Sequence, residues 1–284
     1  MNSLKTVLLL GALSGILLFG GELVGGRNGL EIGLLIAVGM NFFSYFFSDK
    51  LALMSYSAQP VSPQDNPEIY KRVYPLIYNL SQRMGIPMPK LWLIPDASPN
   101  AFATGRDPQH ASVAFTEGIL GLMNDRELEA VIAHELGHVL HRDILISSIA
   151  ATLASAITFI GRMAFWFGGR RDDNDRGGEG GGLLMLIVAP IAALLIQMSI
   201  SRTREFSADA ASVKYTGSPD GLISGLRKLE MGVARVPMDA SPSTAHMFIL
   251  NPFGKGGFMR LFSTHPSTEE RIARLEAMRY APVQ

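Results

Sequence analysis

Four long runs of apolar residues constrain the fold of this chain more than any other feature of its sequence. They occupy residues 6–21, 32–48, 144–161 and 180–201. A helix needs about 20 mostly apolar residues to cross the hydrocarbon core of a bilayer, which is about 30 Å thick, and each run approaches that length. Because 48% of the residues are hydrophobic and they cluster in these runs, we expect a mainly α-helical membrane protein with four transmembrane helices.

Some of these runs have a second interpretation. Residues 6–21 follow Lys5 as the apolar core of a signal peptide would, but no clear A-x-A site follows and the next run begins almost at once. Residues 144–161 and 180–201 could instead form a buried hairpin in a large soluble core, although neither has the polar face of a soluble helix. Basic residues are divided evenly between the two sides, so the positive-inside rule assigns no orientation.

The positions of the runs divide the chain into four parts. Residues 1–48 are expected to form a first transmembrane hairpin, and residues 144–200 a second one that includes a glycine-rich loop. Residues 49–143 and 201–284 are then two parts of one water-exposed domain. Within the second part, residues 233–263 show no clean periodicity and are expected to form a long loop near the working face.

The first water-exposed part alternates helix and strand signals. Residues 67–85 have apolar residues at helical spacing and end in Gly85. Three short segments between residues 90 and 116 predict a small antiparallel sheet. Asn124 and Glu127 then form a capping-box pattern that begins the next helix, and the same spacing recurs near the end of the chain at Ser267 and Glu270.

Charge and cysteine content exclude several classes of site. The formal net charge is zero and basic residues do not cluster, so a nucleic-acid-binding surface is not expected. The chain has no cysteine, which excludes disulfides, thiolate metal sites and cysteine nucleophiles.

An H-E-x-x-H sequence lies in the predicted helix after Asn124. Its histidines, His134 and His138, are four residues apart, so both imidazoles lie on one helix face and can bind one metal ion. Glu135 is placed to take a proton from water on that ion. The pattern that has a third histidine ten residues after the first fails, because Ile144 stands there, and His141 is expected to face solvent or the membrane surface.

Glu205 is the best candidate for the third ligand. If the helix of His138 continues into the third apolar run, and the fourth run continues into the helix of Glu205, both residues lie within ~10 Å of the same membrane surface, at ~1.5 Å rise per residue. An antiparallel hairpin would then bring them side by side. Asp209, one turn further on, is placed to accept the free N–H of a ligating histidine.

Four motifs together resemble one known family over nearly the whole chain. HELGH, SRTREFSAD, NAFATG and STHPSTEERI occur here in the order and spacing of the HtpX family of bacterial membrane proteases, which are relatives of the CAAX-processing endopeptidases. The resemblance implies a gluzincin-like α+β metalloprotease domain. It therefore makes residues 49–143 and 201–284 the two parts of a catalytic domain.

The resemblance also implies roles for residues outside the metal site. Asn100 and Ala101 would belong to an edge strand that holds the substrate backbone, and His265 would hydrogen-bond the oxyanion. Arg204 and Arg271 would pair with acids near the site. The family further implies a multi-pass protein of the bacterial inner membrane whose active site faces the cytoplasm, and a stress-response role in degrading misfolded membrane proteins.

We therefore expect a zinc metalloendopeptidase with one Zn²⁺ per chain, protein substrates and a lipid bilayer as its surroundings. Two other interpretations remain open. An intramembrane metalloprotease also uses H-E-x-x-H, but the charges that flank this helix are unfavourable at bilayer depth. A non-enzymatic membrane scaffold with structural zinc would normally supply four protein ligands, and the sequence offers three.

Overall fold

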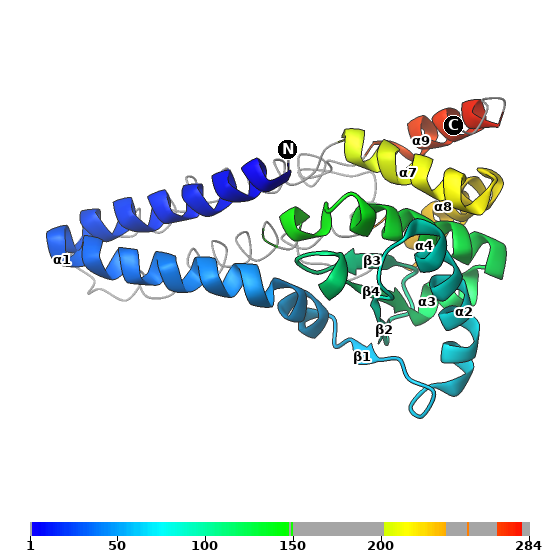
Figure 1. Cartoon of the computed structure of the whole chain (residues 1–284), viewed down its shortest axis with the longest axis horizontal. Helices are drawn as coiled ribbons and strands as arrows, with labels where there is room; N and C mark the ends of the chain where they lie inside the picture. Colours follow the sequence, from blue (N-terminus) through cyan, green and yellow to red (C-terminus); the bar gives the residue numbers. More distant parts are fainter. Residues whose placement is uncertain (1, 148, 150–201, 237–248, 250–265, 280–284) are drawn as a thin grey trace, which may run out of the picture.

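A long helical hairpin projects from a body of helices packed around a small sheet (Figure 1). This computed structural model describes residues 2–147, 149, 202–236, 249 and 266–279. The fourth apolar run, most of the third and most of the expected loop 233–263 lie outside the described residues. The four-span topology and the division of the chain into four parts therefore stay predictions.

The first two apolar runs form the two arms of α1 (Asn2–Ser55). The helix breaks at Gly26, whose φ of 57° and ψ of −138° are accessible mainly to glycine, and the chain folds back there (Figure 1). The arms contact each other through Asn41, whose Nδ2 donates to Ser14 Oγ at 2.8 Å. Gly26–Phe47, in the second arm, is the one stretch within the described ranges that is long and apolar enough to cross a membrane.

The sheet has four strands and is mixed, so the expectation of an antiparallel sheet was wrong. The strands β1 (Gln59–Pro60), β2 (Lys90–Ile94), β3 (Ala101–Thr104) and β4 (Ser112–Thr116) lie in the order β1-β2-β4-β3. Consecutive strands do alternate in direction, as expected. However, β4 inserts between β2 and β3, and two strands of the same direction thereby become parallel neighbours. Among the described strands, the same insertion leaves β3 at an edge of the sheet, and this edge is called its free edge below.

The two faces of the sheet are covered by different parts of the chain, because strand side chains alternate between faces. Phe102, Ala114 and Ile94 pack with Ala52 and Leu53 from the end of α1. The opposite face packs into the main core with α2 (Pro67–Met84) and α4 (Asp125–Leu140). The hairpin that carries the candidate membrane span is thus joined to the sheet by a buried apolar cluster.

Helix α4, which carries the H-E-x-x-H sequence, is buried along most of its length and begins with the predicted capping box. Asn124 Oδ1 accepts the N–H of Glu127, and the Glu127 carboxylate accepts the N–H of Asn124, both at 3.0 Å. The described residues also form α3 (Glu117–Leu122), α7 (Arg202–Thr216), α8 (Asp220–Arg235) and α9 (Thr268–Met278), with a short 3₁₀ turn η1 (Pro108–His110) before β4.

Helix α7 packs antiparallel against α4 at very short range. The two helices approach closely at Gly137, where an added Cβ would lie 3.1 Å from Ala211 Cβ and 3.2 Å from Ala208 Cα. Further along, Ser212 Oγ donates to Ala130 O at 2.7 Å. The glycine between the two histidines therefore allows α7 to lie directly on the metal-binding face of α4 (Figure 1).

The structure corrects one step of the sequence argument. Helix α4 does not continue into the third apolar run: it ends at Leu140, and a new helical segment begins at Ile144. Between them Arg142 adopts a left-handed conformation with φ of 58°, and the N–H of Asp143 donates to His138 O at 2.9 Å. The helix is interrupted here, and the backbone of Asp143 is hydrogen-bonded to the last turn of α4.

Candidate metal centre

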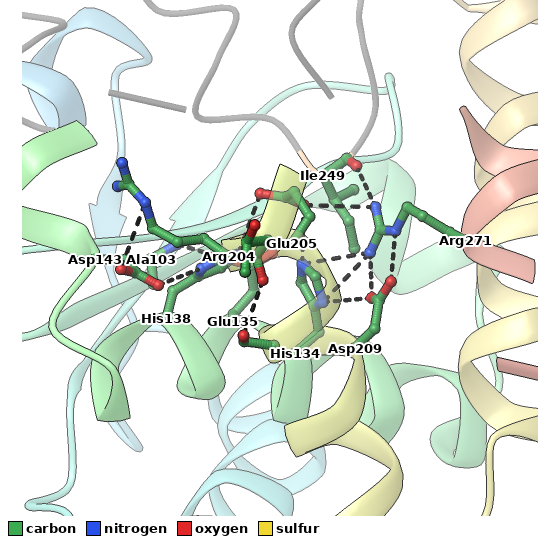
Figure 2. A network of polar contacts seen from close by, with 12 residues as sticks. Ala103, His134, Glu135, His138, Asp143, Arg204, Glu205, Asp209, Ile249 and Arg271 are labelled. Atoms are coloured by element: carbon green, nitrogen blue, oxygen red, sulfur yellow. Dashed lines mark hydrogen bonds and ion pairs between the residues drawn. The ribbon is translucent and has the colours of Figure 1, made fainter. Parts of the chain in front are cut away.

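Two histidines of α4 and one glutamate of α7 converge on one point (Figure 2). Ligand atoms of His134, His138 and Glu205 all lie within 4.8 Å of one another. The Nε2 atoms of His134 and His138 lie 3.7 and 3.6 Å from the two carboxylate oxygens of Glu205. Donors held ~2.0–2.2 Å from one tetrahedral ion would be roughly 3.3–3.6 Å apart, so this donor set fits a metal such as zinc.

Each ligand reaches this point for a local reason. The histidines are separated by one helical turn, and their rings lie 4.9 Å apart on the same face of α4. Glu205 comes from the first turn of α7, which Gly137 allows to lie close to that face. His141, by contrast, follows the last residue of α4 and is exposed.

A buried carboxylate and a buried arginine hold the ring of His134 (Figure 2). Asp209 Oδ1 lies 2.9 Å from His134 Nδ1, so Nδ1 carries the proton in that contact and the Nε2 lone pair faces Glu205. Arg271 Nη2 in turn donates to Asp209 Oδ1 at 2.6 Å, and Nη1 lies 3.8 Å from Glu205 Oε2. Arg271 is completely buried, and this contact with two acids agrees with the pairing that the sequence suggested for it.

Asp143 makes the corresponding contact with the other histidine. Its Oδ2 lies 3.5 Å from His138 Nδ1, and its Oδ1 lies 3.8 Å from Arg204 Nε (Figure 2). Asp143 was not among the site residues expected from the sequence. The available signal was an acid placed five residues after His138, but only the break at Arg142 turns it toward the ring.

Glu135 lies between the metal ligands and the edge strand. Its Oε2 accepts the N–H of Ala103, on the free edge of β3, at 3.0 Å. Burial raises the pKa of Glu135 to about 7, and the neighbouring Glu205 carboxylate adds to this rise. A group with a pKa near neutrality can both accept and release a proton, as a general base requires.

The two histidines have opposite electrostatic surroundings. Burial, reinforced by the Arg271 guanidinium, lowers the pKa of His134 to about 4, which keeps this imidazole neutral and able to bind a metal. Burial alone would lower the pKa of His138 as well, but Asp143, Glu205 and Glu135 raise it to about 9. The acids around His138 thus stabilise a positive charge at this point, and they would stabilise a bound divalent cation in the same way.

The residues expected to bind substrate lie at the start of β3. Thr116 engages both backbone groups of Asn100: Asn100 N–H donates to Thr116 Oγ1 at 2.8 Å, and Thr116 N–H donates to Asn100 O at 3.0 Å. The backbone of Asn100 therefore faces β4, while Ala101 and Ala103 present theirs to the free edge. His265 lies outside the described residues.

The side chain of Asn100 is also buried close to the site. Its Oδ1 accepts the N–H of Ile249 at 3.4 Å, and Ile249 O accepts a hydrogen bond from Arg271 Nη1 at 3.0 Å. Its Nδ2 has no hydrogen-bond partner among the described residues. A buried amide without a partner is costly, so this atom is a candidate for a contact with bound substrate.

The chain matches known proteins over most of its length. Residues 63–279 match peptidase family M48. The chain is 53% identical over 282 residues to a protease HtpX homolog of Thermodesulfovibrio yellowstonii, covering 98% of this chain and 99% of the relative. It is 52% identical over 284 residues to the homolog of Desulfatibacillum aliphaticivorans, covering 98% and 90%. The homolog of Ralstonia nicotianae is 49% identical over 280 residues, covering 98% and 96%.

A solved structure shares the fold. The crystal structure of S. mikatae Ste24p superposes with a TM-score of 0.50 at 18% sequence identity, and the match covers 97% of this chain and 65% of that chain. The mainly helical body with its small mixed sheet is therefore an arrangement that a distant protein also adopts. Because residues 63–279 match the family and the relatives are similar along nearly the whole chain, this protein belongs to the HtpX proteases of peptidase family M48 and is a metalloprotease.

Proposed function

We propose that this metalloprotease is a membrane-bound, zinc-dependent endopeptidase that cleaves extended segments of misfolded or damaged membrane proteins. One observation carries the proposal: the cluster of His134, His138 and Glu205 lies beside Glu135, which is hydrogen-bonded to the free edge of β3. A metal site, a candidate base and a strand edge able to bind a peptide are thus adjacent.

The residues of the site have separate roles in the proposed reaction. A zinc ion bound by His134, His138 and Glu205 would supply a Lewis acid and a water of lowered pKa. Glu135 would act as the base that takes a proton from the attacking water and returns it to the leaving amine. Asp209 keeps the Nδ1 proton of His134 in place, which leaves Nε2 as the ligand atom. His265 is proposed, from the family resemblance, to donate to the oxyanion.

The substrate backbone binds as an additional strand along β3. An extended peptide can add to an exposed sheet edge through main-chain hydrogen bonds. Ala101 and Ala103 offer such groups on the edge that faces Glu135, and Asn100 contributes its side-chain amide. A peptide bound there would place its backbone next to the base, since the N–H of Ala103 on this edge already contacts Glu135.

The membrane part of the proposal rests on α1 and on the apolar runs. The stretch Gly26–Phe47 can cross a bilayer by length and composition, and the buried cluster at the end of α1 joins it to the sheet. We infer a multi-pass protein of the bacterial inner membrane with its active site on the cytoplasmic side. Protease accessibility in inverted vesicles tests this orientation, and accumulation of misfolded membrane proteins in a deletion strain tests the substrate class.

Substitution of the base and of a ligand tests the chemistry. In the detergent-purified full chain, Glu135→Gln is expected to retain zinc and to lower cleavage of an unfolded casein substrate by about 10²–10⁴-fold, the usual contribution of a general base. Glu205→Ala is expected to lose the metal in elemental analysis. Glu129→Gln is the matched control, because Glu129 lies on the same helix but pairs with Arg83, and it should leave both zinc and cleavage unchanged.

Two results would contradict the proposal. Unchanged cleavage by Glu135→Gln would remove Glu135 as the base. Wild-type zinc content in Glu205→Ala would remove Glu205 as a ligand. A protein that binds zinc but shows no chelator-sensitive cleavage would favour the alternative of a scaffold with structural zinc.

A further inference from the structure

Asp143 occupies an unusual position at the end of the metal-binding helix. It follows Arg142, whose left-handed backbone is uncommon for a residue other than glycine, and its side chain is buried. Its N–H donates to His138 O at 2.9 Å, and its own C=O accepts the N–H of Ser147 at 3.3 Å. Helix α4 thus ends before this residue, a new helical segment begins just after it, and the carboxylate lies beside His138.

The two oxygens of Asp143 contact two different elements. Oδ2 lies 3.5 Å from His138 Nδ1, and Oδ1 lies 3.8 Å from Nε of Arg204, the residue that precedes Glu205 in α7 (Figure 2). One buried carboxylate therefore lies between a candidate ligand of α4 and the start of the helix that supplies another. In the sequence, Asp143 and Arg204 also stand at the two ends of the segment with the third and fourth apolar runs.

The two candidate histidine ligands are arranged alike. In each, Nε2 faces Glu205 while Nδ1 faces a buried carboxylate, Asp209 for His134 and Asp143 for His138. A carboxylate on the free nitrogen fixes the tautomer and ring orientation of a ligating histidine. The contact of Asp143 is longer than that of Asp209, 3.5 Å against 2.9 Å, so its effect on the metal should be the smaller of the two.

We propose that Asp143 is a positioning residue for the metal ligand His138, and that Arg204 holds Asp143 in place. The pair then aligns His138 with Glu205 across the junction of α4 and α7. This inference rests on the proposed zinc site, since it assigns to Asp143 the orientation of one of the ligands of that site.

Zinc affinity of the full chain in detergent, measured by competition with a chelator, provides the test. Removal of such a carboxylate typically lowers metal affinity about 10–100-fold, and Asp143→Ala is expected to fall within that range. Asp143→Asn, which keeps the shape and an oxygen acceptor for Nδ1–H, should fall between Asp143→Ala and the wild type. Asp220→Ala is the matched control, because Asp220 also pairs with an arginine, Arg279, but on an exposed surface.

A spectroscopic measurement separates positioning from a general loss of structure. With Co²⁺ in place of zinc, Asp143→Ala should change the visible absorption bands of the bound ion, because the ring of His138 is no longer held, whereas Asp220→Ala should not. Zinc affinity within twofold of the wild type in both Asp143 variants, with unchanged cobalt spectra, would overturn the proposal. Failure of the wild type itself to bind zinc or cobalt would instead overturn the proposed function.

A double variant tests the part assigned to Arg204. If Arg204 acts through Asp143, Asp143→Ala combined with Arg204→Gln should bind zinc no more weakly than Asp143→Ala alone. A double variant whose loss equals the product of the two single losses would show that Arg204 acts independently, and would refute the link between the two residues.

Discussion

Replacement of Gly137 by alanine tests whether the close contact of α4 with α7 positions the metal ligands. Gly137 lies in the interior of α4, between the two histidines. An alanine Cβ there would lie 3.1 Å from Ala211 Cβ, 3.2 Å from Ala208 Cα and 3.4 Å from Ala208 O. Two of these neighbours are backbone atoms of α7, so relief of the contact requires the helix that carries Glu205 to move by a few tenths of an ångström.

Two opposing terms set the expected change in the free energy of unfolding. Alanine is favoured over glycine in a helix interior by about 1 kcal/mol. Overpacking of a well-packed core costs about 1–3 kcal/mol. The metal-free protein should therefore be destabilised by about 0–2 kcal/mol. Zinc affinity should fall by about tenfold, because metal–ligand distances tolerate shifts of only about 0.2 Å.

Gly121→Ala is the matched control, because a Cβ at this helical glycine meets no atom within 4 Å. That variant should be neutral or slightly stabilised and should bind zinc like the wild type. Denaturant unfolding of the metal-free proteins and a chelator competition give the two quantities. If Gly137→Ala is stabilised as much as Gly121→Ala and binds zinc with wild-type affinity, the close approach of the helices does not control the site.

Two further predictions concern buried charges. Arg271→Ala leaves Asp209 and Glu205 without their buried counter-charge and should destabilise the metal-free protein by about 3–5 kcal/mol in denaturant unfolding, with a wild-type midpoint as the refuting result. Burial would raise the pKa of Glu127, but hydrogen bonds from Lys228 and Ser224 outweigh it and hold this pKa below its ordinary value. The unfolding free-energy difference between wild type and Glu127→Gln should therefore be constant above about pH 5 and shrink as the pH falls through the lowered pKa; a difference that grows on acidification would contradict this sign.

The sequence was sufficient for features that depend on local spacing. The capping box of Asn124 and Glu127 and the helix that ends before Gly85 were confirmed, because caps and helix ends are set by residues a few positions apart. The three expected strand segments were also placed correctly, as β2, β3 and β4, whereas β1 was not foreseen. Their order in space was not predicted, because insertion of β4 between β2 and β3 depends on packing against α4 and the end of α1, which adjacent residues do not encode.

In the candidate site, too, the sequence predicted what depends on local spacing and did not predict what depends on tertiary contacts. Because His134 and His138 lie on one helical face, the sequence could place them together, and the choice of Glu205 followed from the expected antiparallel return of the chain. That return is observed between α4 and α7, although α4 ends at Leu140 rather than continuing toward the membrane. The contact of Asp143 with His138 could not be foreseen, because it depends on the backbone conformation of one residue, Arg142.

The sequence by itself determined the metal-binding pattern, the helices and the apolar runs, because each depends on the types and spacing of residues that are close together in the chain. Only the tertiary structure decided which acids face the two imidazoles, which strand has a free edge beside Glu135, and how closely α7 approaches α4 at Gly137. These features join residues far apart in the chain, so they follow from side-chain packing in three dimensions rather than from any local pattern.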